Sequence, residues 1–162
     1  MDDEQLVRIP LKMGQAHVQR EIVLAVPNES HDTFIVRSIP AFAYGVAYGD
    51  VIRVLDQASG DFEVLEHNGQ VTVRVFVRGS LEKPEIRSLI NDILGHKGLY
   101  EVGKASDDPD HLSLLLISLD VKIGFPEIEE ILSSVKHAGH QWEYGNIYDE
   151  NGRQLSWWNR SV

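Results

Sequence analysis

The sequence contains no cysteine among its 162 residues. This absence excludes disulfide bonds, thiolate zinc sites, iron–sulfur clusters and a cysteine nucleophile. Long apolar runs are also missing, because the run at residues 112–119 contains two serines and is far shorter than the ~20 residues of a transmembrane helix. The acidic residues 1–4 lack the basic and apolar character of a secretory signal. We therefore expect a cytoplasmic protein with no membrane partner.

Positive charge is scarce. The chain has 15 lysine and arginine residues against 25 aspartate and glutamate residues, a formal net charge of −10. A field of this sign repels phosphate backbones and anionic lipids, so nucleic acid is disfavoured as a partner. A protein partner with a basic surface is compatible with it, and so is a simple role in solubility.

Familiar catalytic and metal-binding patterns are absent as well. The chain has no glycine-rich phosphate loop, no Gly-x-Ser-x-Gly motif and no His-Glu-x-x-His spacing. Asp107, Asp108 and Asp110 resemble the start of a calcium loop, but Leu112 stands where that loop needs glycine, so we expect a solvated turn. His137 and His140 fall near a predicted helix end, where the helix dipole favours an imidazolium cap. The sequence thus predicts no metal, no cofactor and no catalytic residue.

The first part of the chain is typical of β-structure. Turn-forming residues separate five short segments rich in β-branched and aromatic residues, at 6–11, 17–26, 33–37, 51–55 and 61–66. Short strands at this spacing favour a small β-barrel. We assign this lobe to residues 1–69.

The second part alternates strands with helices. Strands are expected at 71–77, 99–104, 112–119 and 142–148, and two amphipathic helices follow Gly79 and begin at Pro126. The order βαββαβ is that of a ferredoxin-like lobe, assigned to residues 70–162. Asn151-Gly152 then predicts a turn into a C-terminal hairpin strand at 154–158. The predicted fold class is therefore α+β.

Residues 39–54 carry the most ordered pattern. Gly45 and Gly49 lie four residues apart, and Asp50 leads into an apolar strand. Glycine allows positive φ and aspartate bonds nearby backbone N–H groups, so the pattern predicts a structural corner rather than a catalytic loop.

This stretch supports two resemblances. Gly49-Asp50 followed by 51–54 resembles the Gly-Asp box of cradle-loop barrels, which implies that the aspartate bonds backbone groups of a crossing connection. More broadly, residues 39–51 are similar to a bacterial family of uncharacterised two-lobed proteins, a domain of unknown function, with the resemblance extending over residues 5–150. It implies a bacterial protein and assigns no catalytic residue.

Two hypotheses about function follow, with an enzyme built on aspartate and histidine as a third. The first is a non-enzymatic protein-interaction module, by analogy an immunity protein that occludes a cognate toxin. Acidic side chains would pair with the partner's basic groups and a tryptophan would anchor it; the candidates are Asp107, Asp108, Asp110, Glu127, Glu129, Glu130, Trp157 and Trp158. The simpler reading is that the glutamates stabilise a helix N-terminus and that the tryptophans cover a sheet edge.

The alternative hypothesis is a regulatory domain that binds a small molecule. Its ligand cleft would lie between the lobes and be lined by Tyr44, Tyr48 and Arg53. An edge strand of either lobe could also pair with a second copy, so a homodimer is compatible with the sequence.

Overall fold

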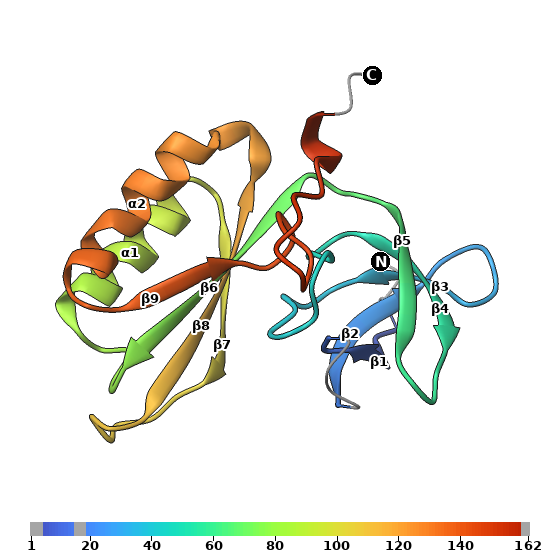
Figure 1. Cartoon of the computed structure of the whole chain (residues 1–162), viewed down its shortest axis with the longest axis horizontal. Coiled ribbons are helices and arrows are strands. Elements are labelled where there is room, and N and C mark those ends of the chain that lie inside the picture. Colours follow the sequence, from blue (N-terminus) through green and yellow to red (C-terminus); the bar gives the residue numbers. More distant parts are fainter. Residues whose placement is uncertain (1–4, 15–18, 160–162) are drawn as a thin grey trace. The chain divides into compact units, whose positions relative to one another are not determined.

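The computed structural model describes residues 5–14 and 19–159 (Figure 1). The acidic start at residues 1–4 and His17 lie outside the described residues. The chain divides into two compact units: unit 1 comprises Met1–Gln70 with Gly145–Val162, and unit 2 comprises Val71–Tyr144. Most strand pairs are antiparallel and each α-helix of the described residues belongs to unit 2, so the predicted α+β class is confirmed.

Unit 1 is built on a five-stranded sheet in the sequential order β1-β2-β3-β4-β5. Its strands are β1 (Val7–Lys12), β2 (Arg20–Pro27), β3 (Thr33–Val36), β4 (Val51–Asp56) and β5 (Asp61–Glu66). Each strand pairs with the next in antiparallel fashion, as alternating segments joined by short turns favour. One face of the sheet buries an apolar core formed by Ile9, Leu11, Val23, Ala25, Val36, Ala43, Val46, Ile52 and Val54.

A closed barrel, which the sequence led us to expect, is not found among the described strands of unit 1. β1 and β5 stand at the two ends of the sheet order. The backbone N–H of Lys12, at the end of β1, donates to the carbonyl of Gly60 at 2.9 Å. This bond joins the end of β1 to the β4–β5 turn and is not part of a hydrogen-bond ladder between paired strands. Alternation of apolar residues specifies the faces of a sheet, whereas closure depends on strand tilt and shear, which the pattern does not encode.

Unit 2 contains a four-stranded sheet in the order β7-β8-β6-β9. The elements are β6 (Gln70–Arg78), α1 (Pro84–Gly95), β7 (Leu99–Lys104), β8 (Leu112–Asp120), a 3₁₀ turn η1 (Val121–Ile123), α2 (Phe125–His137) and β9 (Gln141–Tyr144). The two helices lie next to each other on the same side of the sheet (Figure 1). Their predicted apolar stripes are confirmed, since these side chains are buried: Ile86, Leu89, Ile93, Ile128, Ile131, Leu132 and Val135. Neither helix is long and apolar enough to span a membrane, among the residues described.

The C-terminal segment differs from the sequence expectation. The last strand of unit 2 ends at Tyr144, whereas the sequence predicted that it would continue to residue 148. Residues 145–162 group with unit 1 rather than with the lobe expected at 70–162. Two hydrogen bonds explain the departure from the sheet: Gly45 donates from its backbone N–H to the carbonyl of Gly145 at 3.0 Å, and the Asn146 amide donates to the carbonyl of Gln70 at 2.8 Å.

The turn predicted at Asn151-Gly152 forms, but no long strand follows it. A bridge joins Tyr148 to Gln154, and residues Trp157–Asn159 then form a 3₁₀ helix, η2. The hairpin strand expected at 154–158 is therefore replaced by a 3₁₀ turn in which the two tryptophans take consecutive positions. Asparagine and glycine specify the turn itself, whereas the length of the returning strand depends on partners that a local pattern does not show.

Candidate functional site

Asp50 holds the end of the loop that precedes β4. Its side chain is only 1% exposed. Oδ2 accepts the backbone N–H of Ala47 at 2.9 Å, and Oδ1 accepts that of Asn68 at 2.8 Å. Gly49 has a φ of +86°, and a Cβ at that position would collide with the Asn68 side chain. Because both carboxylate oxygens of Asp50 bind backbone groups, the aspartate has the structural contacts that the sequence predicted.

Glu21 on β2 holds the start of the same loop, which sequence reasoning missed. Its Oε2 accepts the N–H of Ala41 at 2.9 Å, and its Oε1 accepts those of Phe42 at 3.1 Å and Ala43 at 2.8 Å. Successive backbone N–H groups of this kind form a concave anion-binding site, here filled by the protein's own carboxylate. A signal was present: Glu21 shares the strand parity of buried Val23, so it is an acid at an inward-facing position.

A cavity of about 500 Å³ lies within unit 1. The apolar and aromatic part of its lining is Tyr44, Phe62, Val64, Leu155 and Trp157. The ionisable part is Lys12, Asp61, His67, Asp149 and Glu150. These residues come from β1, the 39–49 loop, β5, the connection between β5 and β6, and the C-terminal segment, so the return of residues 145–159 to unit 1 completes the cavity wall.

His67 and Trp157 form an aromatic pair in the cavity lining. Their rings stack at a centroid distance of 5.0 Å and an interplanar angle of 13°. The indole Nε1–H of Trp157 donates to the carbonyl of Asn146 at 2.8 Å, which fixes the indole in place. The Nδ1 atom of His67 is buried without a hydrogen bond and lies 3.5 Å from Oδ2 of Asp50.

The charged part of the lining is mainly acidic. Lys12 Nζ lies 3.5 Å from Oδ1 of Asp61. Oδ1 of Asp149 accepts two backbone N–H groups of its own turn at 2.9 Å each, which positions this carboxylate. Glu150 is exposed and forms no ion pair with another described residue. In the described part of the lining there are therefore three carboxylates and one lysine.

The three residues predicted for a ligand cleft do not come together. Tyr44 lines the cavity of unit 1, whereas Tyr48 and Arg53 are not among its lining residues. Arg53 is exposed on β4 and pairs with Glu63 of β5 at 3.2 Å. Tyr48 is half-buried in the loop before β4. Only one of the three candidates thus belongs to a site that the structure defines.

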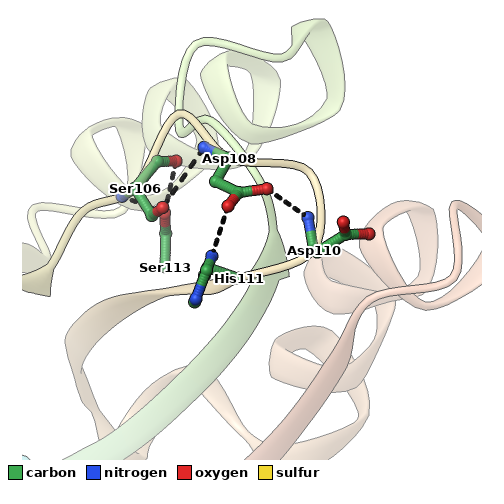
Figure 2. Close-up of polar contacts among 5 residues, drawn as sticks. All are labelled: Ser106, Asp108, Asp110, His111 and Ser113. Carbon is green, nitrogen blue, oxygen red and sulfur yellow. Dashed lines mark hydrogen bonds and ion pairs between the residues drawn. The ribbon is translucent and has the colours of Figure 1, made fainter.

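The acidic candidates at 107–110 lie in the exposed β7–β8 loop of unit 2 (Figure 2). Asp108 organises this loop: its Oδ1 accepts the N–H of Asp110 at 2.9 Å and its Oδ2 lies 2.7 Å from Nδ1 of His111. The Oγ of Ser106 accepts the N–H of Asp108 at 3.2 Å. The solvated turn expected from the sequence is confirmed, and Asp107 is exposed on it.

The acidic candidates Glu127, Glu129 and Glu130 lie elsewhere, in the first two turns of α2. Glu127 is 3.6 Å from Nε2 of His96, and Glu129 accepts the Tyr144 hydroxyl at 3.2 Å. No described contact joins these glutamates to the β7–β8 loop. Within residues 5–14 and 19–159, no three histidine, aspartate or glutamate side chains gather closely enough to hold a metal ion.

The two tryptophan candidates have different environments. Trp157 is 8% exposed and its ring packs against His67, so it is part of a cavity wall and not an exposed anchor. Trp158 is half-buried and meets the Trp157 ring edge-on at 5.5 Å. Trp158 is therefore the more accessible of the two indoles.

The ring of His140 contacts Arg78 and Glu85, whereas the sequence predicted that it would cap the end of α2. It is buried, its Nδ1 accepts the backbone N–H of Arg78 at 3.2 Å, and its Nε2 lies 2.9 Å from Oε1 of Glu85. The hydrogen bond from His140 is the main cause that lowers the pKa of Glu85 below its ordinary value. This pair ties the start of α1 to β6 and is structural.

The fold and site thus define an α+β protein of two compact units, with a lined cavity in the first. The chain belongs to the family described as a domain of unknown function, DUF4265, whose model matches residues 21–144. Membership of an uncharacterised family agrees with the sequence expectation. No curated protein matched the sequence.

One solved structure is similar in fold. It is described as "Novel crystal structure of a hypothetical protein from Neisseria gonorrhoeae". The TM-score is 0.59 at 16% sequence identity, over 90% of this chain and 96% of that chain. At this identity the likeness shows the fold alone.

Proposed function

We propose that the protein binds a small molecule in the cavity of unit 1. The observation that carries this proposal is the composition of the cavity lining, in which the stacked His67–Trp157 pair and apolar side chains share the wall with ionisable side chains. Ligand sites are concave, combine apolar and aromatic side chains with fixed polar groups, and have volumes of roughly 300–1,000 Å³. The cavity of about 500 Å³ is within this range.

The position of the cavity in the fold also supports the proposal. One wall contains Tyr44 and Gly45, from the loop that Glu21 and Asp50 hold at its two ends. Many binding sites are built from loops that a rigid sheet positions. These loop contacts would therefore preorganise the binding site in addition to stabilising the fold.

A thermal-shift screen with a metabolite library tests this function. Leu155→Trp is the matched control, because Leu155 lines the cavity while its backbone N–H bond to Ile147 is independent of the side chain. We expect some compounds to raise the melting temperature of the wild type and not that of the filled-cavity variant. A screen without a hit, or hits that stabilise both proteins equally, would refute the proposal.

A protein-interaction role, including the immunity role, is the second candidate. It is favoured by exposed carboxylates in the β7–β8 loop and on α2, which could pair with a basic partner surface, and Trp158 remains as an accessible aromatic residue. Co-purification from native extract of the wild type beside Glu127→Gln/Glu130→Gln tests it. A partner that is recovered equally with both proteins would contradict a role for these glutamates.

We also propose two structural relationships to known folds. The order β7-β8-β6-β9, with both helices on one side, supports a ferredoxin-like arrangement of unit 2. The contact of Asp50 with the backbone of Asn68, far along the chain, supports kinship with the Gly-Asp box of cradle-loop barrels. A crystal structure of each unit at high resolution would test both relations.

A further inference from the structure

We infer that the ligand of the unit 1 cavity is an organic cation, a primary or substituted ammonium attached to an apolar or aromatic group. This inference rests on the proposed binding function and assigns its ligand class. Two independent features of the lining support it: the polar groups that remain for a ligand are acceptors, and the walls are aromatic.

The acceptor character follows from the contacts of each ionisable group. Among the residues that the structure describes, Lys12 is the one cation of the lining, and it lies beside Asp61. Asp149 and Glu150 add two carboxylates. A ligand that approaches these groups must donate hydrogen bonds and is favoured when it is positively charged. An anion would meet two uncompensated carboxylates.

The aromatic walls favour the same class of ligand. A cation within about 6 Å of an aromatic face is attracted by the negative charge on that face, and tryptophan gives the strongest effect. Trp157 and Tyr44 both line the cavity, together with Phe62. The apolar part of an ammonium ligand would pack on Val64 and Leu155, which also line it.

Three small probes of similar size separate charge from shape. They are phenethylammonium, the neutral 2-phenylethanol and the anionic phenylacetate, each titrated into the full chain by isothermal calorimetry. Cation–π attraction and the acidic lining together predict about ten-fold tighter binding of phenethylammonium than of 2-phenylethanol. Phenylacetate should bind more weakly than the alcohol.

Matched variants test whether the preference for the cationic probe arises at this cavity. Glu150→Gln removes an exposed lining carboxylate and should weaken phenethylammonium binding by about two- to five-fold, with no change for 2-phenylethanol. Glu130→Gln is the control, since it makes the same chemical change on α2, in unit 2. It should leave the affinity of both probes unchanged, which separates the site from a general attraction of cations to an acidic protein.

The failures of the two proposals are distinguishable. Equal or tighter binding of the alcohol or of phenylacetate would overturn the ligand class and leave a binding cavity in place. Equal effects of Glu150→Gln and Glu130→Gln would also overturn the assignment of the cation to this cavity. If none of the three probes gives heat at millimolar concentration, both the ligand class and the proposed function fail.

Discussion

Replacement of Glu21 should destabilise unit 1 far more than replacement of an exposed acidic residue on a strand. The carboxylate accepts the backbone N–H groups of Ala41, Phe42 and Ala43. The bonds to Ala41 and Ala43 are partly buried, whereas the bond to Phe42 is exposed and water can replace it. A hydrogen bond to a charged group contributes about 1.5–3 kcal/mol. Glu21→Ala should therefore lower the free energy of unfolding by about 3–5 kcal/mol.

The conservative variant sharpens this prediction. In Glu21→Gln one oxygen remains and can still accept from Ala43 as a neutral group, while the amide NH₂ faces the N–H of Ala41. The expected loss is about 2–3 kcal/mol, because one bond disappears and another weakens. Urea unfolding followed by tryptophan fluorescence measures it. A Trp142→Phe background removes the indole of unit 2, so that the signal comes from Trp157 and Trp158 in unit 1.

Glu63→Gln provides the control. Glu63 is exposed on β5 and pairs with Arg53, and an exposed pair contributes about 0–1 kcal/mol. The reasoning is refuted if Glu21→Gln lowers the free energy of unfolding no more than Glu63→Gln does. That result would mean that the loop N–H groups find water as readily as they find the carboxylate.

Three further predictions concern the loop corner and unit 2. Gly49→Val should abolish soluble expression, because φ is +86° and a Cβ collides with Asn68; normal expression with an unchanged melting temperature would contradict this. Asp50→Asn should lower the melting temperature while phenethylammonium still binds the folded fraction, and calorimetry below the melting temperature checks this order of effects. The pKa of Glu85 is lowered in the folded state by His140, so its contribution to stability is present above the ordinary pKa and is lost as the pH falls through the folded pKa. Urea unfolding between neutral and acid pH should show a steeper loss for the wild type than for Glu85→Gln, and parallel curves would contradict it.

Local patterns predicted the elements of this fold well. Alternation located the five strands of unit 1, and the spacing of Ile86, Leu89 and Ile93 located α1 with its buried face. Both signals depend only on the spacing of apolar residues within one strand or one helix, so a single segment of sequence is enough to show them. The role of Asp50 was predictable for a similar reason, because it bonds the turn that follows Ala47.

Partners that are distant in the sequence were not predictable. The carboxylate of Glu21 meets residues twenty and more positions away, and the cavity needs Trp157 to return to His67. The extent of the last strand was wrong because Gly145 and Asn146 bind backbone groups of unit 1, which no local pattern reveals. Single-sequence reasoning therefore named Tyr44 for a cleft between the lobes and missed the cavity within unit 1 that Tyr44 lines.

The loop at 39–49 links the most ordered sequence pattern to the proposed function. Its two ends are fixed by carboxylates, and at its centre Gly45 donates to Gly145, so the loop is joined to the segment that supplies Leu155 and Trp157. Both walls of the cavity thus depend on one set of backbone contacts. In Glu21 and Asp50 both carboxylate oxygens already accept backbone N–H groups, whereas Glu150 makes no such contact within the described chain. The acids of unit 1 therefore divide into those that hold the loop in place and those that could bind a ligand in the cavity. Substitution of Glu21 should accordingly reduce stability, whereas substitution of Glu150 should reduce ligand affinity.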